Sequence, residues 1–201
     1  MSRKRSNIFS HEGITRLDKS MILPSVKIKD NVESDIMFKN RAETLDQKIA
    51  KYKSFPDDGT TIIIYTDGST YNNGRKNAKS GYGVFFGNRD IAPISRPVSP
   101  MEKQSNNVAE LMAIHDALVQ IQKEKTGRKI IIYSDSAYSM DVITGKKQAH
   151  TNLDIIARIK KVKSACVIPV EFIHIYAHTD KQDKHSIGND IADYLAGLAS
   201  K

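Results

Sequence analysis

The pattern of apolar and polar positions becomes regular after residue 60 of this 201-residue chain. Residues 62–65, IIIY, are apolar at consecutive positions, as in a strand that is covered on both faces. A loop rich in Gly, Asn and Lys leads to a second apolar run at 81–87. A third run follows at 90–98, and its prolines suit the edge of a sheet. The short separations favour an antiparallel meander of three strands.

Helical periodicity dominates the remainder. Residues 105–125 predict a long helix that Ser105 or Asn106 can cap, with apolar side chains at spacings of three and four. Further helices are predicted at 136–145, 152–163 and 189–200, and strands at 129–135 and 169–178. Because helical crossovers return a chain in one direction, the last two strands should lie parallel to the first. We therefore predict an α/β fold with a five-stranded mixed sheet, three antiparallel strands and then two parallel ones, and helices on both faces.

Residues 1–58 lack this order. They mix charged residues with Ser, Asn and isolated apolar positions, so we interpret them as a basic, mostly disordered N-terminal extension to a domain at 59–201. One short helix is plausible at 41–53, where Leu45, Ile49 and Tyr52 recur at helical spacing.

Composition narrows the class of protein. The formal net charge is +8, and a positive surplus favours a polyanionic partner, most often nucleic acid. The longest apolar runs are far too short to span a bilayer, so no membrane partner is expected. Cys166 is the only cysteine, which excludes an intrachain disulfide and favours a reducing intracellular compartment, cytoplasmic or nuclear.

Acids follow the two best-defined strands. IIIYTDGS and IIIYSDSA are near copies, and they place Asp67 and Asp135 at what should be the same edge of the sheet. Glu110 lies early in the long helix, and Asp190 and Asp193 share a face near the start of the last helix. Each acid alone is more often a turn former or a helix cap. Together they would repel one another unless divalent cations such as Mg²⁺ or Mn²⁺ neutralised them.

Five motifs in order make the chain resemble the type 1 ribonuclease H family from about Thr61 to Lys201. They are TDGS at 66–69, GYGV at 81–84, NNxxELxA at 106–113, DSxY at 135–138 and GNxxADxLA at 188–196. The resemblance implies the ribonuclease H-like fold and an endoribonuclease that cuts the RNA strand of RNA/DNA hybrids. Two Mg²⁺ ions, for which Mn²⁺ can substitute, would drive the cleavage and leave 5′-phosphate and 3′-hydroxyl ends.

The resemblance also implies the site residues. The metal ligands would be Asp67, Glu110, Asp135 and Asp193, with Asp190 in a supporting role. His178 would assist proton transfer or product release, although His185 competes with it because the loop after the last strand is longer than is usual in the family. The residues that resemble the family's substrate contacts, or that lie near them, are Gly68, Ser69, Asn73, Gln104, Asn106, Asn107 and Ser136.

Departures from the family pattern leave alternatives open. The basic, Trp-rich handle of some bacterial members is missing, so hybrid affinity would depend on the basic tail or on a group of six cations. The alternative interpretation of these cations is an ordinary solvated helix face. They are Lys146, Lys147, Arg158, Lys160, Lys161 and Lys163. A binding module without catalysis and the ribonuclease H part of a reverse transcriptase are the other candidates. The four acids oppose the first of these. The initiating Met and the end soon after the last helix favour a free-standing enzyme, which we expect to be a monomer.

Overall fold

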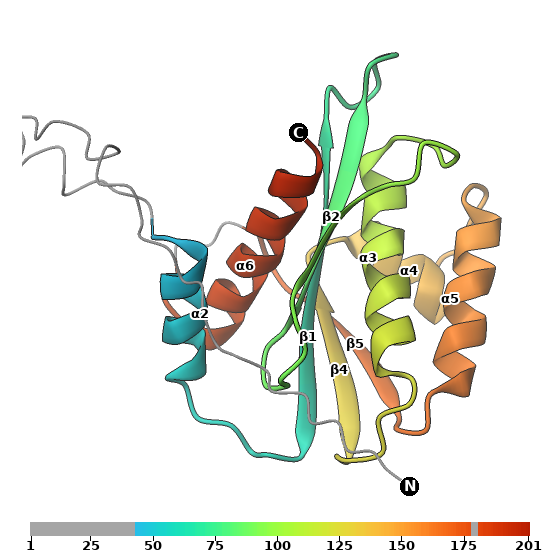
Figure 1. Cartoon of the computed structure of the whole chain (residues 1–201). Coiled ribbons are helices and arrows are strands. Elements are labelled where there is room, and N and C mark those ends of the chain that lie inside the picture. Colours follow the sequence, from blue (N-terminus) through green and yellow to red (C-terminus); the bar gives the residue numbers. More distant parts are fainter. Residues whose placement is uncertain (1–42, 178–180) are drawn as a thin grey trace, which may run out of the picture. The chain divides into compact units, whose positions relative to one another are not determined.

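A mixed sheet in the order β3-β2-β1-β4-β5 forms the centre of the computed structural model, which describes residues 43–177 and 181–201 (Figure 1). β1 pairs antiparallel with β2 and parallel with β4, β2 pairs antiparallel with β3, and β4 pairs parallel with β5. This confirms the predicted sheet. The strands are β1 (Thr61–Tyr71), β2 (Lys79–Phe86), β3 (Ile94–Pro97), β4 (Lys129–Ser134) and β5 (Val170–His174).

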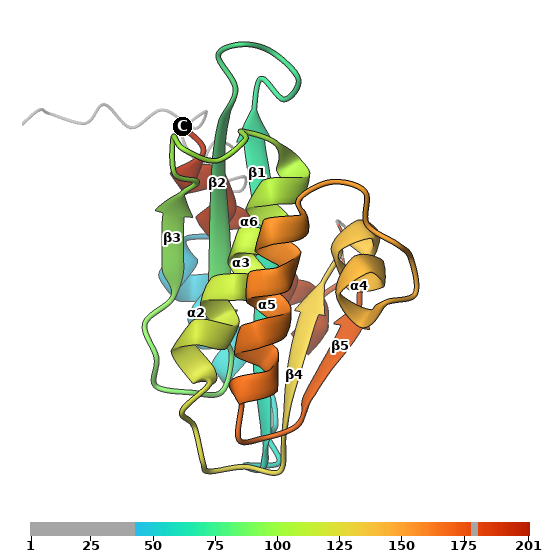
Figure 2. The ribbon, with the colours of Figure 1, turned by 90° about the vertical axis from the view of Figure 1, so that its right-hand side faces the viewer.

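Helices cover both faces of the sheet, as predicted (Figures 1 and 2). α2 and α6 lie on one face, and α3, α4 and α5 lie on the other. Within the described ranges, none of these helices has both the length and the apolar character needed to cross a bilayer. Their bounds are α2 (Leu45–Lys53), α3 (Asn106–Ile121), α4 (Ala137–Thr144), α5 (Leu153–Ala165) and α6 (Lys184–Ala199).

The alternation of side chains along β1 divides the core into two different layers. Ile62 and Ile64 join a largely aliphatic cluster with residues of α3 and α5. Tyr65 joins a cluster under α6 that also contains Phe85 and Tyr133. Because successive side chains of a strand point to opposite faces, Tyr65 shares its face with Asp67, two residues further on.

β1 is longer than its apolar run predicted. Asp67 does not follow the strand but lies within it, opposite Gly83 of β2. The parallel pairing with β4 ends earlier, at Tyr65 and Tyr133, so Asp67 extends beyond the last pair with β4. Asp135, in contrast, directly follows β4, as predicted.

α6 begins five residues before the predicted start. The carboxylate of Asp183 accepts hydrogen bonds from the backbone N–H groups of His185 and Ser186, both at 3.0 Å, and so caps the helix at Lys184. Aspartate is among the preferred capping residues because it satisfies the unpaired donors of the first turn. The added turn places Asp193 in the middle of the helix instead of near its start.

The short helix predicted near residues 41–53 is present as α2. Thr44 caps it in a reciprocal arrangement with Gln47, and Tyr52 is buried in the aromatic cluster under α6. Residues 43–201 form one compact unit. The structure thus includes residues 43–58 in the folded unit, whereas the sequence interpretation assigned them to the extension; residues 1–42 lie outside the described residues.

Candidate active site

Three carboxylates from three different elements meet at one edge of the sheet. Asp67 comes from β1, Glu110 from α3, and Asp135 from the end of β4. Each offers an oxygen, and these oxygens all lie within 4.8 Å of one another. The pairing of β1 with β4 brings the two aspartates together, while α3 crosses the sheet to add the glutamate.

This carboxylate cluster is poorly solvated. Asp67 and Glu110 are only 6% and 3% exposed. Burial, and then the negative charges of Asp135 and Asp193, raise the pKa of Asp67 to about 8. Burial and the charge of Asp67 likewise raise the pKa of Glu110 well above its usual range. Oε2 of Glu110 is buried and has no hydrogen-bond partner among the residues that the structure describes. Burial and mutual repulsion therefore disfavour the ionised form of the cluster.

Gly68 explains how α3 comes so close. A Cβ atom at Gly68 would lie 2.3 Å from the backbone nitrogen of Glu110. The Gly68 backbone N–H also donates a 2.8 Å hydrogen bond to Oδ1 of Asp67. A glycine is thus required here for the close approach of a helix to a strand.

α6 contributes polar groups to the same edge. Asn189 is buried, and its Nδ2 donates to Oδ2 of Asp135 at 3.4 Å, while its Oδ1 has no partner within the described part of the chain. Asp193 is exposed and adds its charge to the surroundings of Asp67. Asp190, three residues before Asp193 on the same helix, has its Oδ2 3.9 Å from Nζ of Lys48 on α2.

Three of the candidate substrate residues line one polar cleft. Asn73 from the β1–β2 loop, with Asn106 and Asn107 from the start of α3, lines a cleft of about 220 Å³. Sequence reasoning did not foresee the other lining residues. Thr151 and Asn152 are more than 40 positions further along the chain, so no local pattern links them to the asparagines. The complete lining is Asn73, Lys103, Ser105, Asn106, Asn107, Thr151 and Asn152.

The remaining candidates make contacts within the protein. The amide of Gln104 accepts from the Ser80 backbone N–H at 2.8 Å and donates to the Ser99 carbonyl oxygen at 3.0 Å, so it ties a loop to β2. Ser136 caps α4 through the Ser139 backbone N–H. Ser69 receives a 3.3 Å hydrogen bond from the hydroxyl of Ser200. None of these three residues lines the polar cleft.

Of the two competing histidines, only His185 is among the residues that the structure describes. His178 lies outside the described residues. His185 is on the first turn of α6, where its Nδ1 lies 2.9 Å from the Tyr65 hydroxyl and its ring lies 4.4 Å from that of Tyr133. These contacts hold His185 between aromatic side chains, and it lines no part of the polar cleft.

Comparison with known proteins agrees with this geometry. A family model described as RNase H matches residues 59–201, and the chain therefore belongs to the ribonuclease H family. Ribonuclease H of Schizosaccharomyces pombe is 37% identical over 147 residues, which make up 67% of this chain and 51% of that protein. Ribonuclease H1 of Mus musculus is 27% identical over 172 residues, 80% of this chain and 58% of that protein. The chain thus spans little more than half the length of these curated relatives.

Solved structures show the same fold. RNase H1 from the halophilic archaeon Halobacterium salinarum NRC-1 superposes with a TM-score of 0.53 at 20% identity, covering 69% of this chain and 96% of that one. LC11-RNase H1, solved in complex with an RNA/DNA hybrid, gives a TM-score of 0.55 at 24% identity, with the same coverage of the two chains.

Proposed function

We propose that this chain is a divalent-metal-dependent endoribonuclease that hydrolyses the RNA strand of RNA/DNA hybrids and leaves 5′-phosphate and 3′-hydroxyl ends. The observation that carries the proposal is the cluster of Asp67, Glu110 and Asp135, which each offer an oxygen within 4.8 Å of the others. Membership of the ribonuclease H family supports it. We propose that the protein acts as a monomer inside the cell.

The donor set fits a hard divalent cation. It is all oxygen, it has surplus negative charge, and the unpartnered Oε2 of Glu110 is free to act as a ligand. Asp67, Glu110 and Asp135 would hold one Mg²⁺ ion, and Asp67 with Asp193 would hold a second. When bound, the ions supply Lewis-acid activation of water and stabilise the leaving oxygen. Asn189 keeps the Asp135 carboxylate in place, and Gly68 does the same for Asp67.

The polar cleft is the proposed contact surface for the hybrid. Amides and hydroxyls can both donate to and accept from the 2′-OH groups that distinguish RNA from DNA. Asn73, Asn106 and Asn107 are placed to do this, and Lys103 adds a positive charge for phosphate. We also propose that Gly68, Ser69 and Ser136 contact the hybrid close to the acids.

The six candidate cations of α5 and the preceding loop are not all available for such contacts. Lys147 forms a 2.6 Å ion pair with Asp141, and Arg158 pairs with Glu102 at 2.7 Å. A hybrid would have to compete with these pairs for phosphate binding there.

The roles of the two histidines follow from their surroundings. We propose that His178 assists proton transfer or product release, as the resemblance implies. His185 is already engaged by Tyr65 and Tyr133, and this favours a structural role for it.

A cleavage assay tests the proposal. End-labelled hybrid, duplex DNA, duplex RNA and a duplex with a single ribonucleotide are incubated with purified protein in Mg²⁺, in Mn²⁺ and in EDTA. We expect cleavage of the hybrid's RNA strand only with a metal, and products that a 5′-phosphate-dependent exonuclease degrades. A protein that binds the hybrid without cutting it in either metal is instead a binding module.

A further inference from the structure

The ring of Tyr65 separates β1 from α6 beside the acids. A Cβ atom at Gly188 of α6 would lie 2.3 Å from Cζ of Tyr65, so the helix rests directly on this ring. Tyr65 also stacks on Tyr133 of β4, with 5.3 Å between the ring centroids and 19° between the planes. A packed aromatic layer of this kind resists compression and sets the distance between the elements it separates. The height of α6 above β1 therefore depends on Tyr65.

This height matters for the site because both elements carry acids. Asp67 lies two residues after Tyr65 on the same face of β1, about 7 Å away along the strand. Asn189 and Asp193 follow Gly188 on α6, and Asp193 is about 7.5 Å further along the helix axis at the rise of an α-helix. If α6 moves relative to the ring, Asp193 moves relative to Asp67, and the amide of Asn189 moves relative to Asp135.

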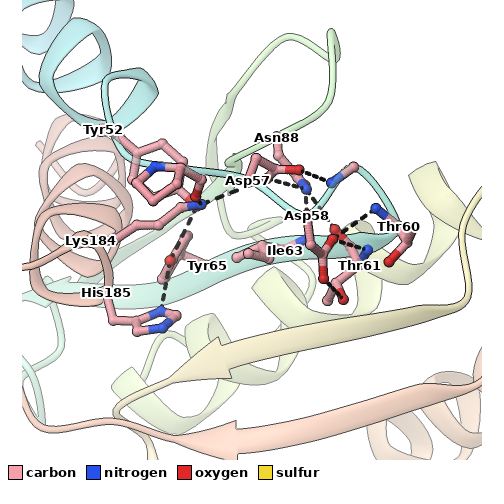
Figure 3. A network of polar contacts seen from close by, with 12 residues as sticks. Tyr52, Asp57, Asp58, Thr60, Thr61, Ile63, Tyr65, Asn88, Lys184 and His185 are labelled. Carbon is pink, nitrogen blue, oxygen red and sulfur yellow. Dashed lines mark hydrogen bonds and ion pairs between the residues drawn. The ribbon is translucent and has the colours of Figure 1, made fainter.

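α2 precedes the residues that the family model matches, and its Tyr52 contacts the Tyr65 ring (Figure 3). Tyr52 is 1% exposed, and its hydroxyl lies 3.3 Å from that of Tyr65. Its ring meets those of Tyr65 and Phe85 edge to face, at centroid distances of 5.6 and 4.9 Å. On the other side, the Tyr65 hydroxyl lies 2.9 Å from Nδ1 of His185. Tyr65 is thus fixed between a residue of α2 and the first turn of α6.

The segment after α2 fastens the same turn of α6. Nζ of Lys184 donates to the Pro56 carbonyl oxygen at 2.7 Å and lies 3.6 Å from Oδ2 of Asp57 and 5.4 Å from the centre of the Tyr52 ring. Asp57 in turn accepts a 2.7 Å hydrogen bond from Asn88 at the end of β2 (Figure 3). These contacts leave little freedom for the start of α6 to move independently of α2 and the sheet.

We propose that Tyr52 and Tyr65 are positioning residues for the proposed metal centre: Tyr52 holds the Tyr65 ring, and the ring holds α6 at the height that places Asp193 beside Asp67 and Asn189 beside Asp135. The inference rests on the proposed function in that it concerns the same metal centre. It adds that a helix outside the family's matched region takes part in shaping that centre.

Mg²⁺ binding to the full chain tests this inference, measured by calorimetry without nucleic acid at a temperature where circular dichroism shows every variant folded. Tyr52→Ala is expected to raise the Kd for Mg²⁺ about tenfold, the size of effect seen when a supporting contact to a ligand is lost. Tyr52→Phe keeps the ring and should give a smaller change in the same direction. In the cleavage assay, Tyr52→Ala should lower kcat more than it raises KM for the hybrid.

Ile159→Ala is the matched control. Ile159 is fully buried in the aliphatic cluster on α5, a helix that carries none of the proposed ligands. It should lower the Tm, as Tyr52→Ala does, but leave the Kd for Mg²⁺ unchanged. The control separates a loss of stability from a misplaced metal site.

Unchanged Mg²⁺ affinity in folded Tyr52→Ala would overturn the inference. An equal loss of Mg²⁺ affinity in Ile159→Ala would overturn it as well. If Tyr52→Ala does not fold, Tyr52→Leu, which also removes the ring, decides, and wild-type Mg²⁺ affinity in that variant overturns the inference. A wild-type chain that binds Mg²⁺ but cuts no hybrid contradicts the proposed function alone, because the comparison of Kd values still decides the inference. A wild-type chain that binds no Mg²⁺ contradicts both.

Discussion

The two ends of β1 carry the same short sequence pattern in opposite surroundings. Asp58-Gly59-Thr60 leads into the strand, and Asp67-Gly68-Ser69 lies in its second half. Asp58 accepts hydrogen bonds from the backbone N–H groups of Thr60 and Thr61 and from the Thr61 hydroxyl, all at 2.7 Å. Asp67 receives a single backbone hydrogen bond, from Gly68, and otherwise faces other acids.

The glycines of the two patterns are needed for different reasons. Gly59 has a φ of +66° and nothing near the position of a Cβ, so it serves a turn. Gly68 has no unusual φ, but a Cβ there would collide with α3. The aspartates differ accordingly: donors, chiefly the Thr61 N–H, hold the pKa of Asp58 below its ordinary 3.8, whereas burial raises the pKa of Asp67 to about 8. Asp58 is therefore surrounded by donors that stabilise its charge, whereas Asp67 lies among acids that disfavour its charge.

Replacing Asp67 should have the largest effect. Asp67→Asn is expected to lower the rate of hybrid cleavage by at least about a thousandfold, because the ligand that both proposed metal ions would share is lost. The metal-free Tm should not fall, because burial and the neighbouring acids already disfavour the ionised form of Asp67, and Asn is uncharged. Cleavage rates and thermal melts in EDTA check both statements.

Asp58→Asn is the matched control for that variant, because it changes the same residue type at the other end of the strand. It should cleave the hybrid at the wild-type rate at temperatures where it is folded. Equal losses of activity in Asp67→Asn and Asp58→Asn would show that Asp67 has no role in cleavage that Asp58 lacks.

The sequence predicted the sheet but not the full length of β1, and three of the four acids that it named, Asp67, Glu110 and Asp135, meet in one cluster. Helical crossovers constrain strand direction, so the parallel pairing of β1 with β4 could be inferred from the order of elements. Residues 66–70, TDGST, have the composition of a turn, and only their pairing with residues 80–84 of β2 keeps them extended. That pairing is a tertiary effect, and local propensity does not report it.

The parts of the site that the sequence missed depend on contacts between distant residues. Thr151 and Asn152 reach the polar cleft because α3 and α5 pack together, and a loop of ordinary composition gives no sign of this. Tyr52 had the right spacing for a helix, but its segment has few apolar residues, so its burial against Tyr65 was not foreseen. The four acids could be named because strand ends and a family motif pointed to them.

Replacing Gly68 and Gly59 by alanine should lower the unfolding free energy by different amounts. Gly68→Ala should cost about 3 kcal/mol or more of unfolding free energy, because the backbone of α3 cannot yield easily to the added methyl group. Gly59→Ala should cost only about 1 kcal/mol, the strain of a left-handed conformation in open space. Chemical denaturation of both variants in EDTA measures the difference. Similar costs at the two positions would contradict the different roles assigned to the two glycines.

Divalent ions should stabilise the folded protein through Asp67 and not through Asp58. At a free Mg²⁺ concentration one hundred times the Kd, the unfolding free energy should rise by about 2.7 kcal/mol, as for any ligand that binds the folded state alone. The gain should disappear in Asp67→Asn and persist in Asp58→Asn. Thermal melts with and without Mg²⁺ give the result, and a gain that survives in Asp67→Asn would place the ion elsewhere.

The smallest expected effect is the pH dependence of the Asp58 contribution. Because its donors hold the folded pKa of Asp58 below the ordinary 3.8, the ionised carboxylate stabilises the fold above that value. The contribution is lost as the pH falls below 3.8 through the folded pKa. Asp58→Asn should therefore lower the Tm by a few degrees at pH 7, and the difference from wild type should shrink in acid. Melts of both proteins from pH 7 to pH 2 measure it. A Tm difference that stayed constant or grew below pH 3.8 would mean that the charge of Asp58 is not what stabilises the entrance to β1.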